Sequence, residues 1–178
     1  MSTSKTFDFT DFHFTVLSPK TCTIGINNNQ HTNAPLSGSG LSGVLIIPEY
    51  AYDDETGNRY EVVETSKYCF RCCSNIVAAQ FPRTLKKIGQ YTFYGAGITS
   101  LIIPRSVEIL DYAAFSAMEK LNSLVFEPGS KLSIIGEIVM NGFNKIRKVV
   151  LPPHVASIAS QFSGMFLQQR RLKCIIVK

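Results

Sequence analysis

The residues of this chain best suited to chemistry are three closely spaced cysteines, in Cys69-Phe-Arg-Cys72-Cys73. A C-x-x-C pair is a common half of a structural zinc site, which needs four ligands and usually takes them from two such pairs. The chain has no second C-x-x-C and no H-x-x-x-H, and Cys22 and Cys174 stand far away in the sequence. We therefore predict no metal and no cofactor. Packing of Cys69 and Cys73 in the core is the favoured reading, because a free thiol packs as a small apolar group, and redox chemistry is the alternative.

The sequence gives no more support for a catalytic site than for a metal site. The three histidines, His13, His31 and His154, are scattered along the chain. No H-E-x-x-H, no G-x-x-x-x-G-K-Ser/Thr, no G-x-G-x-x-G and no Ser-His-Asp order occurs. The sequence predicts no catalytic residues, so the protein is not expected to be an enzyme. Its function must then come from a surface that the fold presents.

An internal repeat shows how such a surface is built. A short run with apolar side chains at its first, fourth and sixth places begins at residues 76, 98, 121, 146 and 172, and the related Gly43–Pro48 precedes these runs. In Ile98-Thr-Ser-Leu-Ile-Ile-Pro104 the apolar set is Ile98, Leu101 and Ile103. This alternation predicts a short parallel strand, and the proline, which has no N–H, ends it. The period of 22 to 26 residues is in the range of leucine-rich repeats.

A second apolar signal recurs later in each unit, as in Leu85 and Ile88 or Val107 and Leu110. Five residues beyond it come Phe93, Phe115 and Met140, which we expect to stack as one internal column. The next unit breaks the pattern, since Ser163 falls in the column and Phe162 and Phe166 are the nearby substitutes. No unit can bury its apolar face alone, so the units must stack into a solenoid.

The residues of these repeats resemble those of a known family. Ile98 to Phe115 reads I-T-S-L-I-I-P-R-S-V-E-I-L-D-Y-A-A-F, which resembles the BspA-like leucine-rich repeat family over about residues 11–178, and Leu85 to Phe93 is another close copy. Thr65 departs from the pattern, since an Ile is expected there. The resemblance implies an α/β leucine-rich-repeat solenoid that is right-handed and curved. It would carry a parallel β-sheet on the concave face, short second strands with 3₁₀ or helical turns on the convex side, and a β-rich N-terminal cap.

The chain divides accordingly into three regions. We expect a flexible tail at 1–10 and a β-rich cap at 11–63 with a polar loop at 27–43. The repeats follow at 64–178 and form one continuous domain with the cap. A content of 45% hydrophobic and 17% charged residues excludes a disordered chain and a charged coiled coil.

The open face of the strands is the candidate site. If the first, fourth and sixth places point inward, the third and fifth must point outward. The fifth places of Ile102, Val125, Val150 and Ile176 would form an apolar stripe. Strand propensity alone is the alternative explanation, because β-branched residues favour sheets even when they are exposed. The predicted partner-binding residues are Gln80, Ser100, Ile102, Ser123, Val125, Lys148, Val150, Cys174 and Ile176, with Val44, Ile46 and Ala78 in the same two rows.

Charge is distributed unevenly along the chain. Residues 145–178 carry seven basic side chains and no Asp or Glu, whereas residues 49–64 carry six acidic side chains against one arginine. The basic end is expected to meet an acidic protein segment, or the acidic cap of a second copy through the last strand. The sequence disfavours nucleic acid as a partner, since few aromatics accompany these charges. The predicted basic end comprises Lys145, Arg147, Arg170, Arg171 and Lys173.

Together these features predict a non-catalytic scaffold that docks a protein or peptide, as an intracellular adaptor or carrier. The chain shows no secretory signal and no apolar run of about 20 residues, so a cytoplasmic or nuclear location without a membrane span is expected. The alternative follows from the resemblance, because BspA-like proteins are commonly regarded as cell-surface adhesins or antigens that bind host proteins or other cells. That alternative requires non-classical export.

Overall fold

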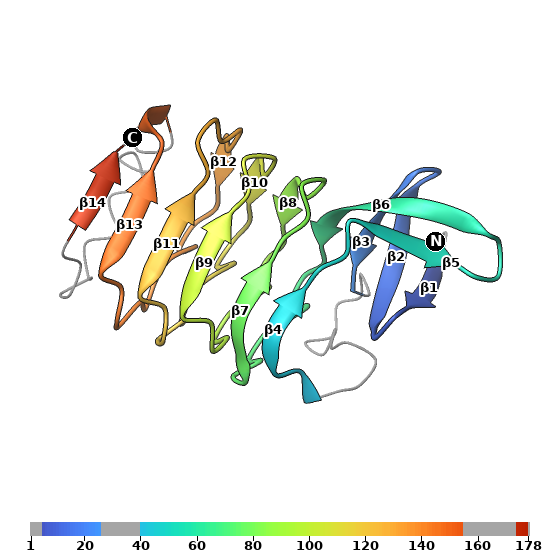
Figure 1. Cartoon of the computed structure of the whole chain (residues 1–178), viewed down its shortest axis with the longest axis horizontal. Helices are drawn as coiled ribbons and strands as arrows, with labels where there is room; N and C mark the ends of the chain where they lie inside the picture. The colour runs from blue at the N-terminus through green and yellow to red at the C-terminus, as the bar shows by residue number, and fades with distance from the viewer. Residues whose placement is uncertain (1–4, 26–39, 155–173, 178) are drawn as a thin grey trace.

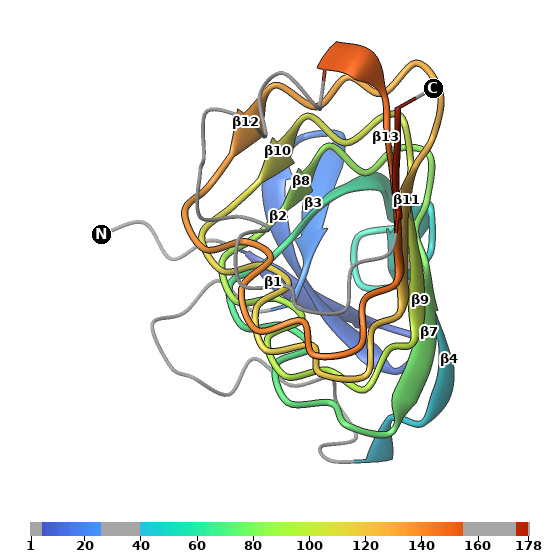
Figure 2. The same cartoon turned by 90° about the vertical axis from the view of Figure 1, so that its left-hand side faces the viewer.

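The structure, a computed structural model, describes residues 5–25, 40–154 and 174–177, the last range by its backbone alone. Its strands form two sheets along a stack of coils (Figure 1). Viewed along the stack, the coils superimpose, with the longer repeat strands on one side and the short second strands on the other (Figure 2). The predicted repeat solenoid with parallel strands is therefore confirmed.

The N-terminal cap is a β-meander and a hairpin that lead into the sheet of short strands. β2 pairs with β1 and β3 in antiparallel fashion, β5 pairs with β6 in the same way, and β3 pairs with β6 in parallel. The cap and the coils share one apolar core, which runs from Phe7 to Leu151. The cap strands are β1 (Thr6–Phe9), β2 (Phe12–Ser18), β3 (Thr21–Ile24), β5 (Tyr50–Asp53) and β6 (Asn58–Thr65).

Strand β1 places residues 6–9 of the expected tail (1–10) in a sheet, and residues 1–4 lie outside the described part of the structure. Phe7 is buried, and its ring centroid lies 5.6 Å from that of Phe14 and 5.3 Å from that of Tyr60. Residues 6–9 are ordered because these ring contacts and four ladder pairs with β2 hold them. The apolar signal is only two phenylalanines long, which is too short to recognise in a polar N-terminal sequence.

The parallel sheet contains one repeat strand per coil. Its order is β14-β13-β11-β9-β7-β4, so the strand that precedes the repeats in the sequence, β4, opens the same sheet. Each described strand from β9 to β13 buries its fourth and sixth places and turns the fifth outward, as Leu101, Ile103 and Ile102 show. The strands are β4 (Gly43–Ile46), β7 (Ile76–Gln80), β9 (Ser100–Ile103), β11 (Ser123–Phe126), β13 (Lys148–Leu151) and β14 (Cys174–Val177).

Each described coil also carries a short second strand. β8 (Lys87–Ile88), β10 (Ile109–Leu110) and β12 (Ile134–Ile135) pair in parallel and continue the sheet from β6. In all three the second residue is buried, as predicted from the Ile88 and Leu110 positions. The short second strands that the resemblance implied are therefore present.

The α/β class and the 3₁₀ or helical turns on the convex side are not confirmed. Within the described coils the segment after each short strand is a series of turns, and helical geometry is confined to Pro153–His154 and a single residue at Gly40, beside undescribed ranges. The physical reason is that alternate amides donate to the next coil, as Phe93 N does to Ala114 O at 2.8 Å. A helix would direct these amides back along its own chain.

Left-handed backbone makes this outward bonding possible. Two residues before the internal column, Tyr91 has a φ of 53° and Ala113 a φ of 52°; two residues after it, Gly95 has 68° and Ala117 has 58°. Each such residue turns its N–H toward the neighbouring coil, and the amides between them close turns within the coil. Only one of these four positions is glycine, so sequence inspection could not identify the geometry.

The predicted internal column is confirmed. Phe93 lies between Phe70 and Phe115, with ring centroids 5.3 Å and 6.0 Å away and rings tilted by 20° and 24°. Met140 is buried at the equivalent place, and Phe12 extends the column into the cap at 6.1 Å from Phe70. The break predicted at Ser163, Phe162 and Phe166 lies outside the described residues. The column fixes the spacing of the coils and, through them, of the repeat strands.

Candidate protein-binding face

The candidate site is the outer face of the parallel sheet, which we define as the side chains at the third and fifth places of its strands. Neighbouring parallel strands lie about 4.8 Å apart, so equivalent side chains form rows across the sheet. The described third-place residues are Val44, Ala78, Ser100, Ser123 and Lys148, and the described fifth-place residues are Ile46, Gln80, Ile102, Val125 and Val150.

The fifth-place row is aliphatic over three consecutive strands. Val125 is the ladder partner of Ile102 on one side and of Val150 on the other. Ile102 is 55% exposed, whereas Val125 and Val150 are half-buried. The backbone of Ile176 pairs with Val150, but its side chain lies outside the described part of the structure. The predicted apolar stripe is thus in register, with three of its four side chains placed.

The aliphatic fifth-place row is interrupted by a polar residue toward the cap. Gln80 is exposed on β7, where it pairs with Ile46 of β4, a residue 61% exposed. The described pairing between β7 and β9 is the single pair Ala78 and Ser100. A polar side chain and a shortened ladder therefore separate Ile46 from Ile102.

The third-place row is more polar. Ser123 pairs with Ser100 and with Lys148, and the Lys148 backbone pairs with that of Cys174. Ser100 and Lys148 are exposed, and Ser123 is half-buried. Among the described third- and fifth-place residues, Lys148 carries the one charge. The candidate face is therefore mainly aliphatic, with hydroxyls on one side and one cation at the C-terminal end.

A shallow depression of about 240 Å³ lies in the same region. Its floor includes the buried Phe126 and Pro152, and Val125, Val150 and Lys148 line it from the two strands. It forms where β11 and β13 end at their prolines, because the chain there turns away from the sheet. The depression can receive an aliphatic side chain beside an ammonium group.

The predicted basic end is described only in part. Lys145 and Arg147 are exposed in the segment that leads into β13, next to Lys148. Arg170, Arg171 and Lys173 lie outside the described residues. The two described cations of the predicted basic end therefore lie beside the start of β13, toward the C-terminal end of the sheet.

The thiols have the properties of packed side chains. Cys69 is buried and Cys73 is half-buried, and Cys72 is exposed. Burial raises the pKa of the Cys22 thiol to about 12 and that of Cys73 to about 11, and it raises the pKa of Cys69 as well. A raised thiol pKa reduces the fraction of nucleophilic thiolate at these three cysteines. The predicted packing holds fully for Cys69 and partly for Cys73.

The remaining ligand types lie apart from one another. His13 Nδ1 is 2.5 Å from Asp8 Oδ1 in the cap, His154 is exposed at the far end, and His31 falls outside the described ranges. Among the described residues, no group of three or more His, Cys, Asp and Glu is placed to hold a metal ion. The described part of the chain also contains no helix of the length and apolarity that crossing a membrane requires.

A tyrosine cluster on the opposite side of the coils was not predicted. Tyr91 stacks on Tyr68 at 5.1 Å and makes edge contacts with Tyr94 at 5.7 Å and Tyr112 at 5.3 Å. The guanidinium of Arg71 lies 5.5 Å from the Tyr94 ring centroid. Burial raises the pKa of the Tyr91 hydroxyl, and Tyr112 raises it further. We call the four tyrosines with Lys67 and Arg71 the tyrosine shelf.

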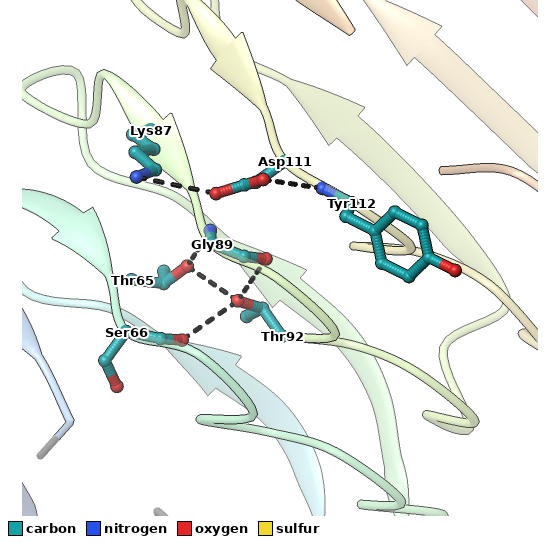
Figure 3. A network of polar contacts seen from close by, with 7 residues as sticks. All are labelled: Thr65, Ser66, Lys87, Gly89, Thr92, Asp111 and Tyr112. Atoms are coloured by element: carbon teal, nitrogen blue, oxygen red, sulfur yellow. Dashed lines mark hydrogen bonds and ion pairs between the residues drawn. The ribbon is translucent and has the colours of Figure 1, made fainter. Parts of the chain in front are cut away.

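A buried hydroxyl network lies next to the shelf (Figure 3). Thr65 Oγ1 is 2.9 Å from Thr92 Oγ1 and accepts the Gly89 N–H at 2.9 Å, and Thr92 Oγ1 donates to the carbonyls of Gly89 and Ser66. Thr65 is the residue that departs from the repeat pattern. Its hydroxyl is satisfied because Thr92 stands one coil away, so the departure is a local polar contact and needs no ligand.

The repeats of this chain match a known protein family. The family profile described as "BspA type Leucine rich repeat region" matches residues 60–176 in six copies. A comparison with curated protein sequences finds no match.

Solved structures share the fold at low identity. A leucine-rich repeat protein from Bacteroides capillosus superimposes with a TM-score of 0.54 at 16% identity, over 97% of this chain and 98% of that one. The pneumococcal vaccine antigen PcpA gives the same TM-score and identity over 85% of this chain but 45% of its own length. The T. pallidum leucine-rich repeat protein TpLRR gives 0.50 at 20% identity, over 79% and 69% of the two chains.

Proposed function

The chain belongs to the BspA-type leucine-rich repeat family, and from this premise we propose that it is a non-catalytic scaffold that docks a protein segment on the outer face of its parallel sheet. The observation that carries the proposal is the in-register aliphatic row of Ile102, Val125 and Val150. A polar residue at the fifth place would leave the core intact, because this place points away from it. An aliphatic row on the outside therefore favours a partner that covers it.

The rigidity of the face supports this function. In β9, β11 and β13 each fifth-place residue lies between two buried residues, as Ile102 lies between Leu101 and Ile103, so the core fixes where the aliphatic row lies. A preorganised face loses little conformational entropy when it binds. Side chains from several coils can then act together on one partner, although no coil alone presents more than two outward places.

The chemistry of the face specifies the partner. Aliphatic side chains of the partner would cover the row, and the depression beside Val125 and Val150 would take one of them. Lys148, with Lys145 and Arg147 close in the sequence, favours carboxylates at the flank. We propose an acidic protein segment with aliphatic anchors, bound within the cell by an adaptor or carrier.

The experiment compares two double variants as bait for proteins from the native cell. Ile102→Asp with Val125→Asp places two charges in the row. Ile134→Asp with Ile138→Asp makes the same change at two exposed isoleucines that lie outside the outer face. A protein retained by the wild type and the second variant but lost from the first supports the proposal. Equal retention by both folded variants would move the site elsewhere.

A second candidate function is that of a cell-surface antigen or adhesin. The observation that favours it is the likeness to the pneumococcal vaccine antigen PcpA, which shares the fold over 85% of this chain. Protease treatment of intact cells separates the two candidates. Digestion of the protein on intact cells supports the surface function, and full protection with release only after lysis supports the intracellular one.

A further inference from the structure

We infer that the tyrosine shelf is a second binding surface, independent of the outer face, and that its ligand is a polysaccharide bearing carboxylate groups. The shelf combines four aromatic rings with two cations from three consecutive coils. It belongs to the turns that follow the short strands, whereas the outer face belongs to the repeat strands. Figure 2 shows in end view that the segments after the short strands and the repeat strands lie on different sides of the coils.

The rings give the ligand an apolar platform with polar edges. Tyr91, Tyr94 and Tyr112 are each partly exposed, and Tyr68, which stacks on Tyr91, is buried. In Figure 3 the ring of Tyr112 points away from the buried threonine network. The C–H face of a sugar ring packs on such aromatic surfaces, and phenolic hydroxyls both donate to and accept from sugar hydroxyls.

The cations determine the charge of the ligand. Arg71 is exposed and stacks over two rings, 5.7 Å from Tyr68 and 5.5 Å from Tyr94, and Lys67 Nζ lies 4.9 Å from the Tyr68 centroid. Arg71 forms no ion pair with any other described residue. A stacked guanidinium is held in place with its N–H edge available for a carboxylate.

The backbone of the shelf excludes an extended peptide bound through main-chain pairing. The amides of Tyr68 and Tyr91 already donate to Gln90 O at 2.9 Å and Tyr112 O at 3.0 Å, and Tyr94 N donates to Tyr91 O. A peptide strand needs free main-chain partners to add to an edge. These three amides are not available to a ligand, so an added protein strand is disfavoured, and a chain of sugar rings that packs on aromatic side chains fits the shelf better.

The experiment uses the full chain and a galacturonic acid hexasaccharide, with its carboxyl-reduced neutral form as the matched ligand. We expect calorimetric binding of the acidic hexasaccharide and an affinity at least about tenfold weaker for the neutral form, because the neutral form cannot accept a charge-assisted hydrogen bond from Arg71. Arg71→Ala should weaken binding by a similar factor. Arg83→Ala removes an exposed arginine elsewhere and should leave the affinity unchanged.

Two further measurements keep the inference falsifiable if a variant is unstable. Ring resonances of Tyr91, Tyr94 and Tyr112 in the wild type should shift on titration, and those of Tyr50 and Tyr52 in the cap should not. Hexaglutamate and a six-residue oligothymidylate should fail to bind at the concentrations where the hexasaccharide saturates. Equal binding of either, equal binding of the neutral hexasaccharide, or no binding of the acidic one would overturn the inference.

Discussion

Val125 of β11 is paired in register with Ile102 of β9, and both side chains point away from the core on the same side of the sheet. Their neighbours in sequence, Leu124 and Leu101, are also paired and are fully buried. In each strand, therefore, adjacent residues have different roles: one side chain packs between the coils, and the next is available to a partner. A scaffold function for this protein depends on that alternation.

The alternation predicts opposite effects of two adjacent substitutions. Leu101→Ala removes a buried side chain and should lower the free energy of unfolding by about 2–5 kcal/mol. Ile102→Ala removes an exposed side chain and should change it by about 0.5 kcal/mol or less. Urea unfolding of both variants provides the measurement. Equal losses at the two positions would show that the strand is buried on both sides.

The phenylalanine column predicts a large loss of stability at its centre. Phe93 is fully buried between Phe70 and Phe115, so Phe93→Ala leaves a cavity and should cost about 3–5 kcal/mol. Phe9→Ala, at a partly buried phenylalanine in the cap, is the matched control and should cost less. The comparison uses chemical denaturation followed by circular dichroism. A smaller loss at Phe93 than at Phe9 would contradict the column as a main source of stability.

Coil spacing predicts a strict requirement for glycine at one turn. A Cβ on Gly97 would lie 2.0 Å from the carbonyl oxygen of Ser74 in the preceding coil, so Gly97→Ala must push two coils apart. Gly40→Ala meets nothing within 4 Å and is the control. We expect a clear fall in the thermal midpoint for the first variant and no fall for the second. An unchanged midpoint for Gly97→Ala would mean that the coils are further apart than the structure places them.

The cap predicts a dependence of stability on pH. Asp53 Oδ2 lies 2.5 Å from Lys5 Nζ and 2.6 Å from Thr56 Oγ1, and these hydrogen bonds lower the pKa of the Asp53 carboxyl in the folded protein. A carboxyl with a lowered folded pKa stabilises the fold above its unfolded pKa of about 3.9, and the contribution is lost as pH falls through the folded pKa.

The thermal midpoints of the wild type and Asp53→Asn should therefore differ at about pH 7 and converge toward about pH 3. Asp54→Asn, at the exposed neighbour, removes the same charge and should show no such convergence. A difference between wild type and Asp53→Asn that is constant over this range would contradict the role of the Lys5 contact.

Much of this fold follows from sequence periodicity because each repeat obeys the same packing rule. The strand rows and the column of Phe93 and Phe115 were predicted because equivalent places in successive units must stack. The tyrosine shelf was not predicted because its rings come from three different places of the repeat: Tyr68 and Tyr91 share one place, and Tyr94 and Tyr112 occupy two others. Only the three-dimensional path of the coil brings these places together.

The cap and the turns escaped prediction for local reasons. Two phenylalanines in β1 are too few to establish alternation. Left-handed backbone at Tyr91 and Ala113 has no sequence signal, because glycine is the residue that normally marks it. Thr65 was identified as a departure from the repeat, but its hydrogen-bond partner Thr92 could be found only once the coils were superimposed.

Site-specific photo-crosslinking tests the central claim most directly. A benzoylphenylalanine in place of Ile102 stands on the outer face, and the same residue in place of Ile134 stands on the other sheet. With both proteins expressed in the native cell and irradiated, a partner covalently joined at position 102 and absent at position 134 is the result that the account predicts. Crosslinking at position 134 alone, or equally at both positions, would contradict a binding site on the parallel sheet.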